Sequence, residues 1–417
     1  MAVDPTPAPL AAAARDRLRI PARAARQQSL RSHNLGLVFR EVLEAPSPVS
    51  RADVAALTGL TRATVSALVE QLVAARLVGE LTPVAGQRAG RPAVPLVPAR
   101  GTVAAVGMEV NVDYLGVCAV DMAGETLVEH IVRDDFRHSD PEPVLDRLAG
   151  LAAGVVDELQ ARGVAIVGTA LAIPGLVDSV TGPLRLAPNL GWRDLDVLAV
   201  VARHPVLAAV PPRLGNDAKL AAIAESRARR RTGPSSFVYV SGEVGIGGAI
   251  VLDGAIFRGV HGWSGEIGHV AVGTDGPPDV GGTLESYAGQ DALMDAAGLP
   301  RTAPISELLA GGQTADRAMD AAAGALGVVL SSVVNIVDVD HVVLGGIYAE
   351  LADRLGPAVE AQLRDRVIAA SWTEVAVEAA IAGRYPAMTG GALSVLEAIA
   401  EDPAEWIGSE EDTALAQ

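Results

Sequence analysis

Three short helices are predicted at the start of the chain, because apolar residues recur there at helical spacing. The first begins at Ser32 and ends before Pro46, the second runs from Ser50 to Leu57, and the third begins at Thr61. The apolar stripes are Leu35, Val38, Phe39, Val42 and Leu43 in the first helix and Val65, Leu68, Val69 and Leu72 in the third. A glycine turn joins the second and third helices, which is the pattern of a helix-turn-helix.

Two strands are predicted after these helices, at residues 77–81 and 94–97. The loop between them contains glycines and the arginines Arg88 and Arg91. A hairpin with a basic loop after a helix-turn-helix is typical of a wing, whose arginines meet phosphate or the minor groove. The first hundred residues therefore predict a winged helix-turn-helix.

Beyond residue 100 the pattern changes to apolar runs that predict strands separated by helices. The predicted elements are strands at 103–110, 115–120, 126–132 and 164–173, a helix at 141–161, and a strand with a hairpin at 237–240, 248–252 and 255–260. The apolar segment 321–337 contains Ser331, Ser332 and Asn335, which favours a buried helix over a membrane span. By itself, the periodicity establishes only an α/β class.

Composition adds a division of charge to this picture. The 417 residues are 50% hydrophobic and carry a net charge of −17, yet the first hundred hold thirteen arginines and seven acidic residues. A basic first quarter and an acidic body are expected of a DNA-binding head on a ligand-sensing body. Cys118 is the single cysteine, which excludes a disulfide framework. No signal segment is recognisable, so we expect a cytoplasmic protein.

The third helix offers candidates for contact with DNA. Thr61, Arg62, Thr64 and Ser66 lie at its N-terminal end, away from the apolar stripe. The N-terminal residues of a recognition helix meet base edges in the major groove, where arginine pairs with guanine. The alternative is a solvated amphipathic helix in some other small domain.

A second candidate site follows the central hairpin. Glu266 and His269 stand three residues apart among glycines, and a carboxylate with an imidazole suits the hydroxyls of a sugar. We expect the glycines to let the backbone approach a ligand. The alternative is that both side chains are surface polar groups of a turn.

The run Gly265-Glu266-Ile267-Gly268-His269 resembles the sugar-site signature of the ROK family of repressors, open reading frames and sugar kinases. The resemblance extends from about residue 30 to residue 398, and Gly90-Arg91-Pro92 resembles the wing of ROK repressors. It implies a two-lobed actin-like (ribonuclease H-like) sugar-kinase fold behind the winged head. It also implies sugar-binding roles for Asn189, Asn216, Asp217, Glu266, His269 and Glu285.

Two family features are altered. Where ROK kinases have the glycines and threonine of an Asp-x-Gly-Gly-Thr phosphate loop, this chain has Asn111, Val112 and Asp113, whose side chains would crowd ATP and repel its phosphates. The three cysteines that hold zinc in many members are missing from residues 276–285, so we expect no metal and no cofactor. The first alteration favours a protein that binds sugar without phosphorylating it, and the second leaves His269 free for sugar alone.

We therefore expect a sugar-responsive repressor with a disordered tail at 1–28, a winged head at 29–98, a ROK body at 99–400 and an acidic, disordered tail at 401–417. Its expected partners are an inverted-repeat operator and a monosaccharide or sugar phosphate, and its expected assembly is a homodimer or homotetramer. One alternative is a sugar kinase with a fused DNA-binding head. Another is a regulator whose body senses a protein, which depends on whether Glu266 and His269 meet Asn216 and Asp217.

Overall fold

The computed structural model describes residues 22–82, 94–178, 182–273 and 282–408, and for residues 22–28 the backbone alone. The chain divides into two compact units, Met1–Pro98 with Ile399–Gln417, and Ala99–Ala398. The units are described separately below.

The smaller unit has three helices followed by a two-stranded antiparallel sheet. Its elements are α1 (Ala22–Glu44), α2 (Arg51–Thr58), α3 (Arg62–Ala74), β1 (Val78–Glu80) and β2 (Leu96–Pro98). The predicted capping box is confirmed, because Ser50 and Asp53 each cap the other's backbone N–H. Gly59 ends α2 with a φ of +71°. The chain then bends, so that the directions of α2 and α3 differ by 117°. The predicted apolar stripes of α1 and α3 form the buried core of this unit.

Two boundaries differ from the sequence-based expectation. Helix α1 begins at Ala22 instead of Ser32, since the alanines and arginines that precede Ser32 are good helix formers even without an apolar stripe. The acidic tail was expected from residue 401, but residues 403–408 are helical. The end of the preceding helix lies against α1, because a Cβ at Gly36 would lie 2.7 Å from the carbonyl oxygen of Glu401. Arg88 and Arg91 lie outside the described residues.

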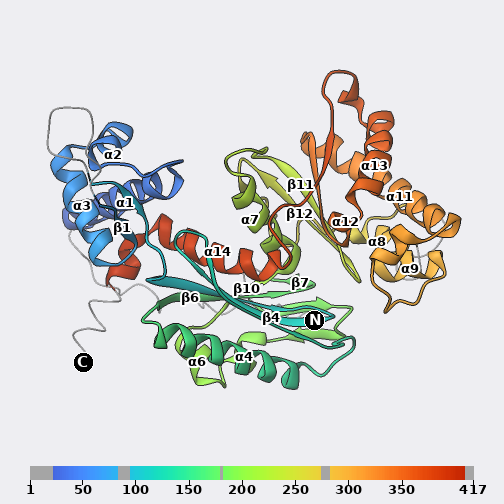
Figure 1. Ribbon diagram of the computed structural model, residues 1–417, viewed down its shortest axis with the longest axis horizontal. Coiled ribbons are helices and arrows are strands. Elements are labelled where there is room, and N and C mark those ends of the chain that lie inside the picture. Colours follow the sequence, from blue (N-terminus) through green and yellow to red (C-terminus); the bar gives the residue numbers. More distant parts are fainter. Residues whose placement is uncertain (1–21, 83–93, 179–181, 274–281, 409–417) are drawn as a thin grey trace, which may run out of the picture. The chain divides into compact units, whose positions relative to one another are not determined.

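The larger unit contains two lobes, each built on a five-stranded mixed sheet (Figure 1). The first sheet has the order β10-β6-β3-β4-β5 and the second has the order β13-β12-β11-β14-β15. The first-lobe strands are β3 (Val103–Val110), β4 (Tyr114–Asp121), β5 (Thr126–Arg133), β6 (Ala165–Ile173) and β10 (Arg213–Asn216). The second-lobe strands are β11 (Phe237–Gly242), β12 (Ile246–Leu252), β13 (Ala255–Ile256), β14 (His341–Gly346) and β15 (Ala376–Ala379).

The two sheets repeat one topology. In each, the first three strands form an antiparallel meander, and the fourth and fifth pair in parallel on the other side of the first strand. The predicted strand at 103–110 is confirmed at both ends, whereas the last hairpin strand stops at Ile256 instead of Val260. A small third sheet is formed by β7 (Leu176–Val177), β8 (Leu184–Ala187) and β9 (Trp192–Leu195).

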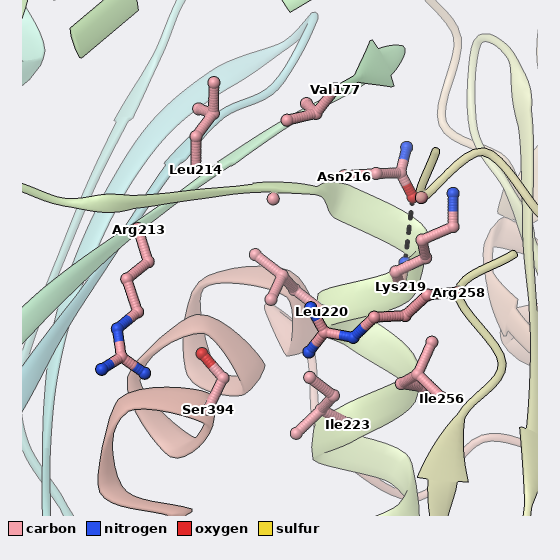
Figure 2. A pocket seen from close by; sticks show the side chains of 12 residues that line it. Val177, Arg213, Leu214, Asn216, Lys219, Leu220, Ile223, Ile256, Arg258 and Ser394 are labelled. Atoms are coloured by element: carbon pink, nitrogen blue, oxygen red, sulfur yellow. Dashed lines mark hydrogen bonds between the residues drawn. The ribbon is translucent and has the colours of Figure 1, made fainter. Parts of the chain in front are cut away.

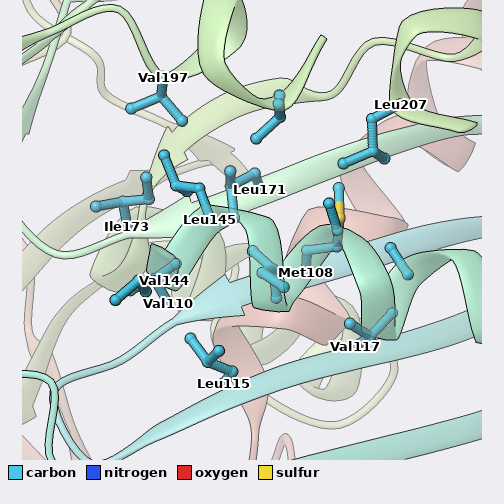
Figure 3. Close-up of a cluster of buried hydrophobic side chains, with 14 of the residues drawn as sticks. Met108, Val110, Leu115, Val117, Val144, Leu145, Leu171, Ile173, Val197 and Leu207 are labelled. Carbon is cyan, nitrogen blue, oxygen red and sulfur yellow. The ribbon is translucent and has the colours of Figure 1, made fainter. Parts of the chain in front are cut away.

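Helices cover both faces of the first sheet. On one face lie α4 (Pro141–Ala161), α5 (Val197–Val201) and α6 (Pro205–Ala209), and on the other lies α14 (Pro386–Glu401) (Figure 1). Figure 3 shows how Leu145 of α4 meets Met108 and Leu171 of the strands in the core of this lobe. Because aromatic residues are only 3% of the chain, the core depends on valine, leucine and alanine packed closely.

The second sheet lies between α7 (Asp217–Arg229) and a larger group of helices. That group comprises α8 (Leu284–Ala288), α9 (Gln290–Ala297), α10 (Ser306–Ala310), α11 (Gln313–Val337), α12 (Ile347–Glu350) and α13 (Ala352–Arg366), with 3-10 turns at Ile267–His269 and Ile368–Ser371. Of the helices that the structure describes, α11 is the single continuous one with the length and hydropathy of a membrane span. Half of its apolar window is buried in the lobe, which agrees with the predicted core helix.

The chain passes between the lobes twice, and buried charges join the two passages. Helix α7 is the first passage, and residues 380–385 are the second. Glu225 of α7 accepts hydrogen bonds from the backbone N–H groups of Ile381 and Ala382 at 2.9–3.0 Å. Arg229, one turn later, pairs with Glu225 and Glu378. The two passages are therefore fixed to each other.

Candidate functional site

The six residues predicted to bind sugar line one cavity of the larger unit. Asn189 belongs to the first lobe, Glu266, His269 and Glu285 to the second, and Asn216 and Asp217 stand at the junction of β10 and α7. The cavity is also lined by residues for which no sugar-binding role was predicted, namely Asn111, Val112, Pro174, Gly175, Pro188, Ser241, Glu243, Gly245, Ile246 and Gly247. Residues that are far apart in the sequence are thus brought together.

Asn216 and Asp217 are positioned by the start of α7. The Asn216 side chain accepts from the backbone N–H of Lys219 at 3.0 Å, and its amide donates to Gly175 O and to Asp217 Oδ1. Asn216 is therefore a helix cap that orients Asp217, and its hydrogen-bonding groups are occupied by the protein itself. Burial raises the pKa of Asp217 to about 6. The oxygen Oδ2 of Asp217 has no hydrogen bond within the described ranges, so it can accept one from a ligand hydroxyl.

Glu266 stands on a loop that lies against β12. A Cβ at Gly265 would lie 2.6 Å from the carbonyl oxygen of Gly248, and one at Gly268 would lie 2.2 Å from that of Ile246. The glycines around Glu266 thus serve contact between loop and strand, which differs from the expectation that they admit a ligand. Lys219 approaches Glu266 to 3.4 Å, and burial raises the pKa of Glu266. His269 is exposed at the end of the same loop.

Glu285 and Asn189 meet beside a third glycine. Glu285 Oε2 accepts from the backbone N–H of Ile246 at 2.9 Å, which fixes the carboxylate at the start of β12. A Cβ at Gly245 would lie 2.7 Å from Asn189 Nδ2 and 2.8 Å from Glu285 Oε2. An amide donor and a carboxylate acceptor therefore stand side by side, as recognition of neighbouring hydroxyls requires.

Asn111, Val112 and Glu243 form another part of the cavity wall. Asn111 and Val112 are buried, and the Asn111 amide donates to Glu109 Oε1 at 3.3 Å. Burial raises the pKa of Glu109 to about 7, and burial together with the nearby Glu109 charge raises the pKa of Glu243 to about 8. Asn111 and Val112 therefore add bulk to this wall, and Glu243 is mostly protonated at neutral pH.

Asp113 occupies a different place from the one expected. It was predicted to stand where a threonine hydroxyl would meet phosphate, but it does not line the cavity. Its carboxylate instead lies 3.5 Å from the guanidinium of Arg137 and is 42% exposed. Glu243, from the second glycine-rich turn, supplies the acidic group on the cavity wall.

The residues predicted to contact DNA at the start of α3 have two different roles. Thr61 accepts from the backbone N–H of Thr64, and the two hydroxyls are 2.9 Å apart, so both threonines serve the helix cap. Arg62 is exposed and forms no side-chain hydrogen bond with the residues that the structure describes. Ser66 lies one turn after Arg62 and is partly exposed. These two side chains remain available for an external partner.

Three contributors to the cavity had no predicted sugar-binding role. Lys219 holds Glu266, Glu109 holds Asn111, and Ser241 lines the wall. The helical spacing of Lys219 from Asn216 was a usable signal, because residues three apart share a helix face. Glu109 and Ser241 lie within apolar strands, where the sequence gives no indication that one supports Asn111 and the other lines a cavity.

Residues 105–398 match the ROK family. The chain belongs to the ROK family. This ROK protein is 31% identical over 275 residues to the xylose repressor of Bacillus subtilis, which covers 64% of this chain and 68% of that protein. Among solved structures, it is similar to a ROK family transcriptional regulator described as a homolog of the E. coli Mlc protein, with a TM-score of 0.74, 23% identity, and coverage of 91% of this chain and 99% of that one.

The ROK hexokinase of Thermus thermophilus is similar to the body. Its TM-score is 0.57 at 27% identity, and the match covers 71% of this chain and 99% of the hexokinase. Repressors and kinases of the family thus share the two-lobed fold seen here, and the predicted actin-like kinase fold is confirmed for the body.

Proposed function

We propose that this ROK protein is a sugar-responsive transcriptional repressor that acts in the cytoplasm. The observation that carries the proposal is the convergence of Asp217, Glu266, His269 and Glu285 on one cavity that Asn111 and Val112 also line. Such a site can hold a sugar, and the side chains of Asn111 and Val112 in place of glycines support binding without a phosphate donor. The similarity to a xylose repressor supports the same function.

The smaller unit fits the operator-binding head. Two helices at a sharp angle followed by a short antiparallel sheet are the elements of a winged helix-turn-helix, with α3 as the recognition helix. Arg62 and Ser66 would contact base edges, while Thr61 and Thr64 hold the start of the helix. We keep Arg88 and Arg91 as proposed backbone contacts of the wing. The expected operator is an inverted repeat bound by a homodimer or homotetramer.

The charge of the cavity limits the chemical class of the effector. Four acidic side chains line it, from Asp217, Glu243, Glu266 and Glu285, near the ammonium of Lys219, although Glu243 is mostly protonated at neutral pH because its pKa is raised to about 8. An added phosphate would be repelled, so a neutral monosaccharide is favoured over a sugar phosphate at this site. Convergence of these groups also favours a small ligand over a protein partner, which would need a broad exposed surface.

The response would arise from closure of the lobes around the sugar. Closure is a rigid-body motion, and a lobe that moves relative to the chain at 95–101 changes the spacing of two heads in a dimer. The sugar shifts this equilibrium only by its differential affinity for the closed state.

The test is operator affinity, measured with and without a panel of pentoses and hexoses, for wild type, Asp217→Ala and Glu266→Ala. Both variants should bind the operator normally and lose at least about tenfold in sugar sensitivity. Asp157→Ala is the matched control, because this exposed acid of α4 lies away from the cavity. A sugar response that persists in both cavity variants, or that a chelator abolishes, would contradict the proposed site.

The kinase alternative is tested with the same protein. With ATP, magnesium and the sugar panel, we expect no ADP release above background, because Asn111 and Val112 crowd the phosphate loop. Turnover that disappears in Asp217→Asn would instead identify a sugar kinase with a DNA-binding head.

A further inference from the structure

A second cavity of about 200 Å³ lies beside α7 and is lined by cations instead of acids. Arg213 of β10, Arg258 after β13 and Lys219 of α7 contribute to its wall, and no carboxylate does so within the described part of the chain. It shares Asn216 with the sugar cavity but none of that cavity's four carboxylates. In a chain of net charge −17, this local excess of positive charge needs an explanation.

The two arginines line this cavity on opposite sides. Figure 2 shows the guanidinium groups of Arg213 and Arg258 on either side of the Ser394 hydroxyl in this view. Neither side chain forms a hydrogen bond or ion pair with any residue of the described ranges. Other arginines of the body do pair with acids, as Arg354 does with Asp320 at 2.6 Å. Two unpaired cations that face one space repel each other unless an anion joins them.

The remaining walls indicate what kind of anion fits. Apolar side chains of Leu214, Leu220, Ile223 and Ile256 surround the arginines, and the Ser394 hydroxyl donates to Gly391 O, so the donors left for an anion are those of the cationic side chains. Guanidinium groups bind planar or tetrahedral oxyanions through paired N–H donors. An apolar wall beside them accommodates the carbon skeleton of a small molecule.

We propose that this cavity is a binding site for a small organic oxyanion, with the phosphate or carboxylate group held between Arg213 and Arg258. The site is separate from the sugar cavity, whose acids repel the same group. The protein would then hold a neutral sugar and an anionic metabolite in two adjacent cavities that meet at the start of α7.

The test is isothermal titration calorimetry of the full chain at constant ionic strength with three probes: glucose 6-phosphate, inorganic phosphate and benzoate. The phosphate ester and the carboxylate distinguish the two sources of the oxyanion. We expect at least one organic probe to bind wild type, and Arg213→Gln and Arg258→Gln each to weaken it at least about tenfold. Both arginines are exposed, so neither change should unfold the protein.

Two matched controls distinguish binding in this cavity from binding elsewhere on the protein. Arg193→Gln removes an exposed arginine of β9 that does not line the cavity, and Glu285→Gln changes the sugar cavity at a residue that is not paired with Lys219, so both should bind the probe like wild type. Equal binding by wild type and the double arginine variant, or no binding of either organic probe, would overturn the proposal. A probe lost in Glu285→Gln but kept in the double variant would occupy the sugar cavity and overturn it as well.

Discussion

At the scale of single residues, the glycines beside Glu266 determine where the acid stands. The loop that carries Glu266 touches the backbone of β12 at Gly265 and Gly268, and any side chain there would enter the space of a carbonyl oxygen. Because the carbonyl oxygens belong to a paired strand, they cannot move away without breaking the sheet.

We predict that Gly268→Ala destabilises the protein by about 1–3 kcal/mol, since its Cβ would lie 2.2 Å from the carbonyl oxygen of Ile246. The same change should weaken sugar binding by displacing Glu266. The measurement is urea denaturation with sugar titration. Gly273→Ala is the control, because a Cβ at Gly273 meets no atom within 4 Å. Equal stability of the two variants would show that the loop can shift freely.

The sequence predicted correctly which residues line the site. It predicted the role of each residue there less well. Glu266, His269 and Glu285 were identified from a motif, and all three line the cavity. Asn216 lines it as well, yet its donors and acceptor are consumed by the helix cap and by Asp217. A motif records which residue types stand together, whereas hydrogen-bond partners depend on atoms that only the folded chain brings near.

At the scale of elements, α3 separates its structural face from its exposed face. Val65, Leu68 and Leu72 are buried, while Arg62 points away from that stripe. The threonine pair at its start satisfies backbone N–H groups that a helix end leaves open. Recognition and stability are thus assigned to different residues of one short helix.

We predict that Arg62→Ala reduces affinity for the operator by about 1–3 kcal/mol and leaves binding to random DNA almost unchanged. The operator is first obtained by selection from a random DNA library, and affinities are then measured by fluorescence anisotropy at one fixed salt concentration. Arg88→Ala and Arg91→Ala should weaken both kinds of DNA alike. An equal loss on both by Arg62→Ala would remove this residue from the base-reading surface.

Element boundaries were predictable where an apolar pattern or a capping box marked them. The strand at 103–110 has a continuous apolar pattern and the helix after Ser50 has a capping box, and both were predicted correctly. The start of α1 and the helical turn at 403–408 were missed, because neither segment shows an apolar stripe. Just before the second segment, Glu401 packs against Gly36, and that contact spans most of the chain.

At the scale of the whole molecule, three acids from different elements share one buried site. Glu109 comes from β3, Asp217 from α7, and Glu243 from the turn between β11 and β12. Their pKa values are raised to about 7, 6 and 8, chiefly by burial. At neutral pH the folded protein therefore keeps protons that the unfolded chain has already released.

We predict that the stability of the body falls as pH rises from about 4.5, where the unfolded carboxyls ionise, to about 8, where Glu243 loses its proton in the folded state. Glu243→Gln should make the dependence shallower and raise stability at pH 8. Urea midpoints at pH 5, 6.5 and 8 measure this. Glu129→Gln, an exposed acid of β5, should keep the wild-type dependence. Identical profiles for wild type and Glu243→Gln would refute the prediction.

The repeated topology of the two lobes was accessible only through the family resemblance. Periodicity predicted strands and helices in the right order, but the pairing of β3 with β6 and of β11 with β14 crosses long connections. Such pairings are decided by which apolar faces meet in three dimensions, and a single sequence does not state that.

Helix α14 has a consequence for the order of assembly. The backbone N–H of Met388 donates to Glu109 across 279 residues of chain, and Gly107 has no room for a side chain because the Met388 carbonyl lies against it. A ribosome releases the first sheet long before it releases the helix that covers one of its faces. The nascent chain must therefore make the whole second lobe while that apolar face stays bare, and a chain that stops before Pro386 never covers it.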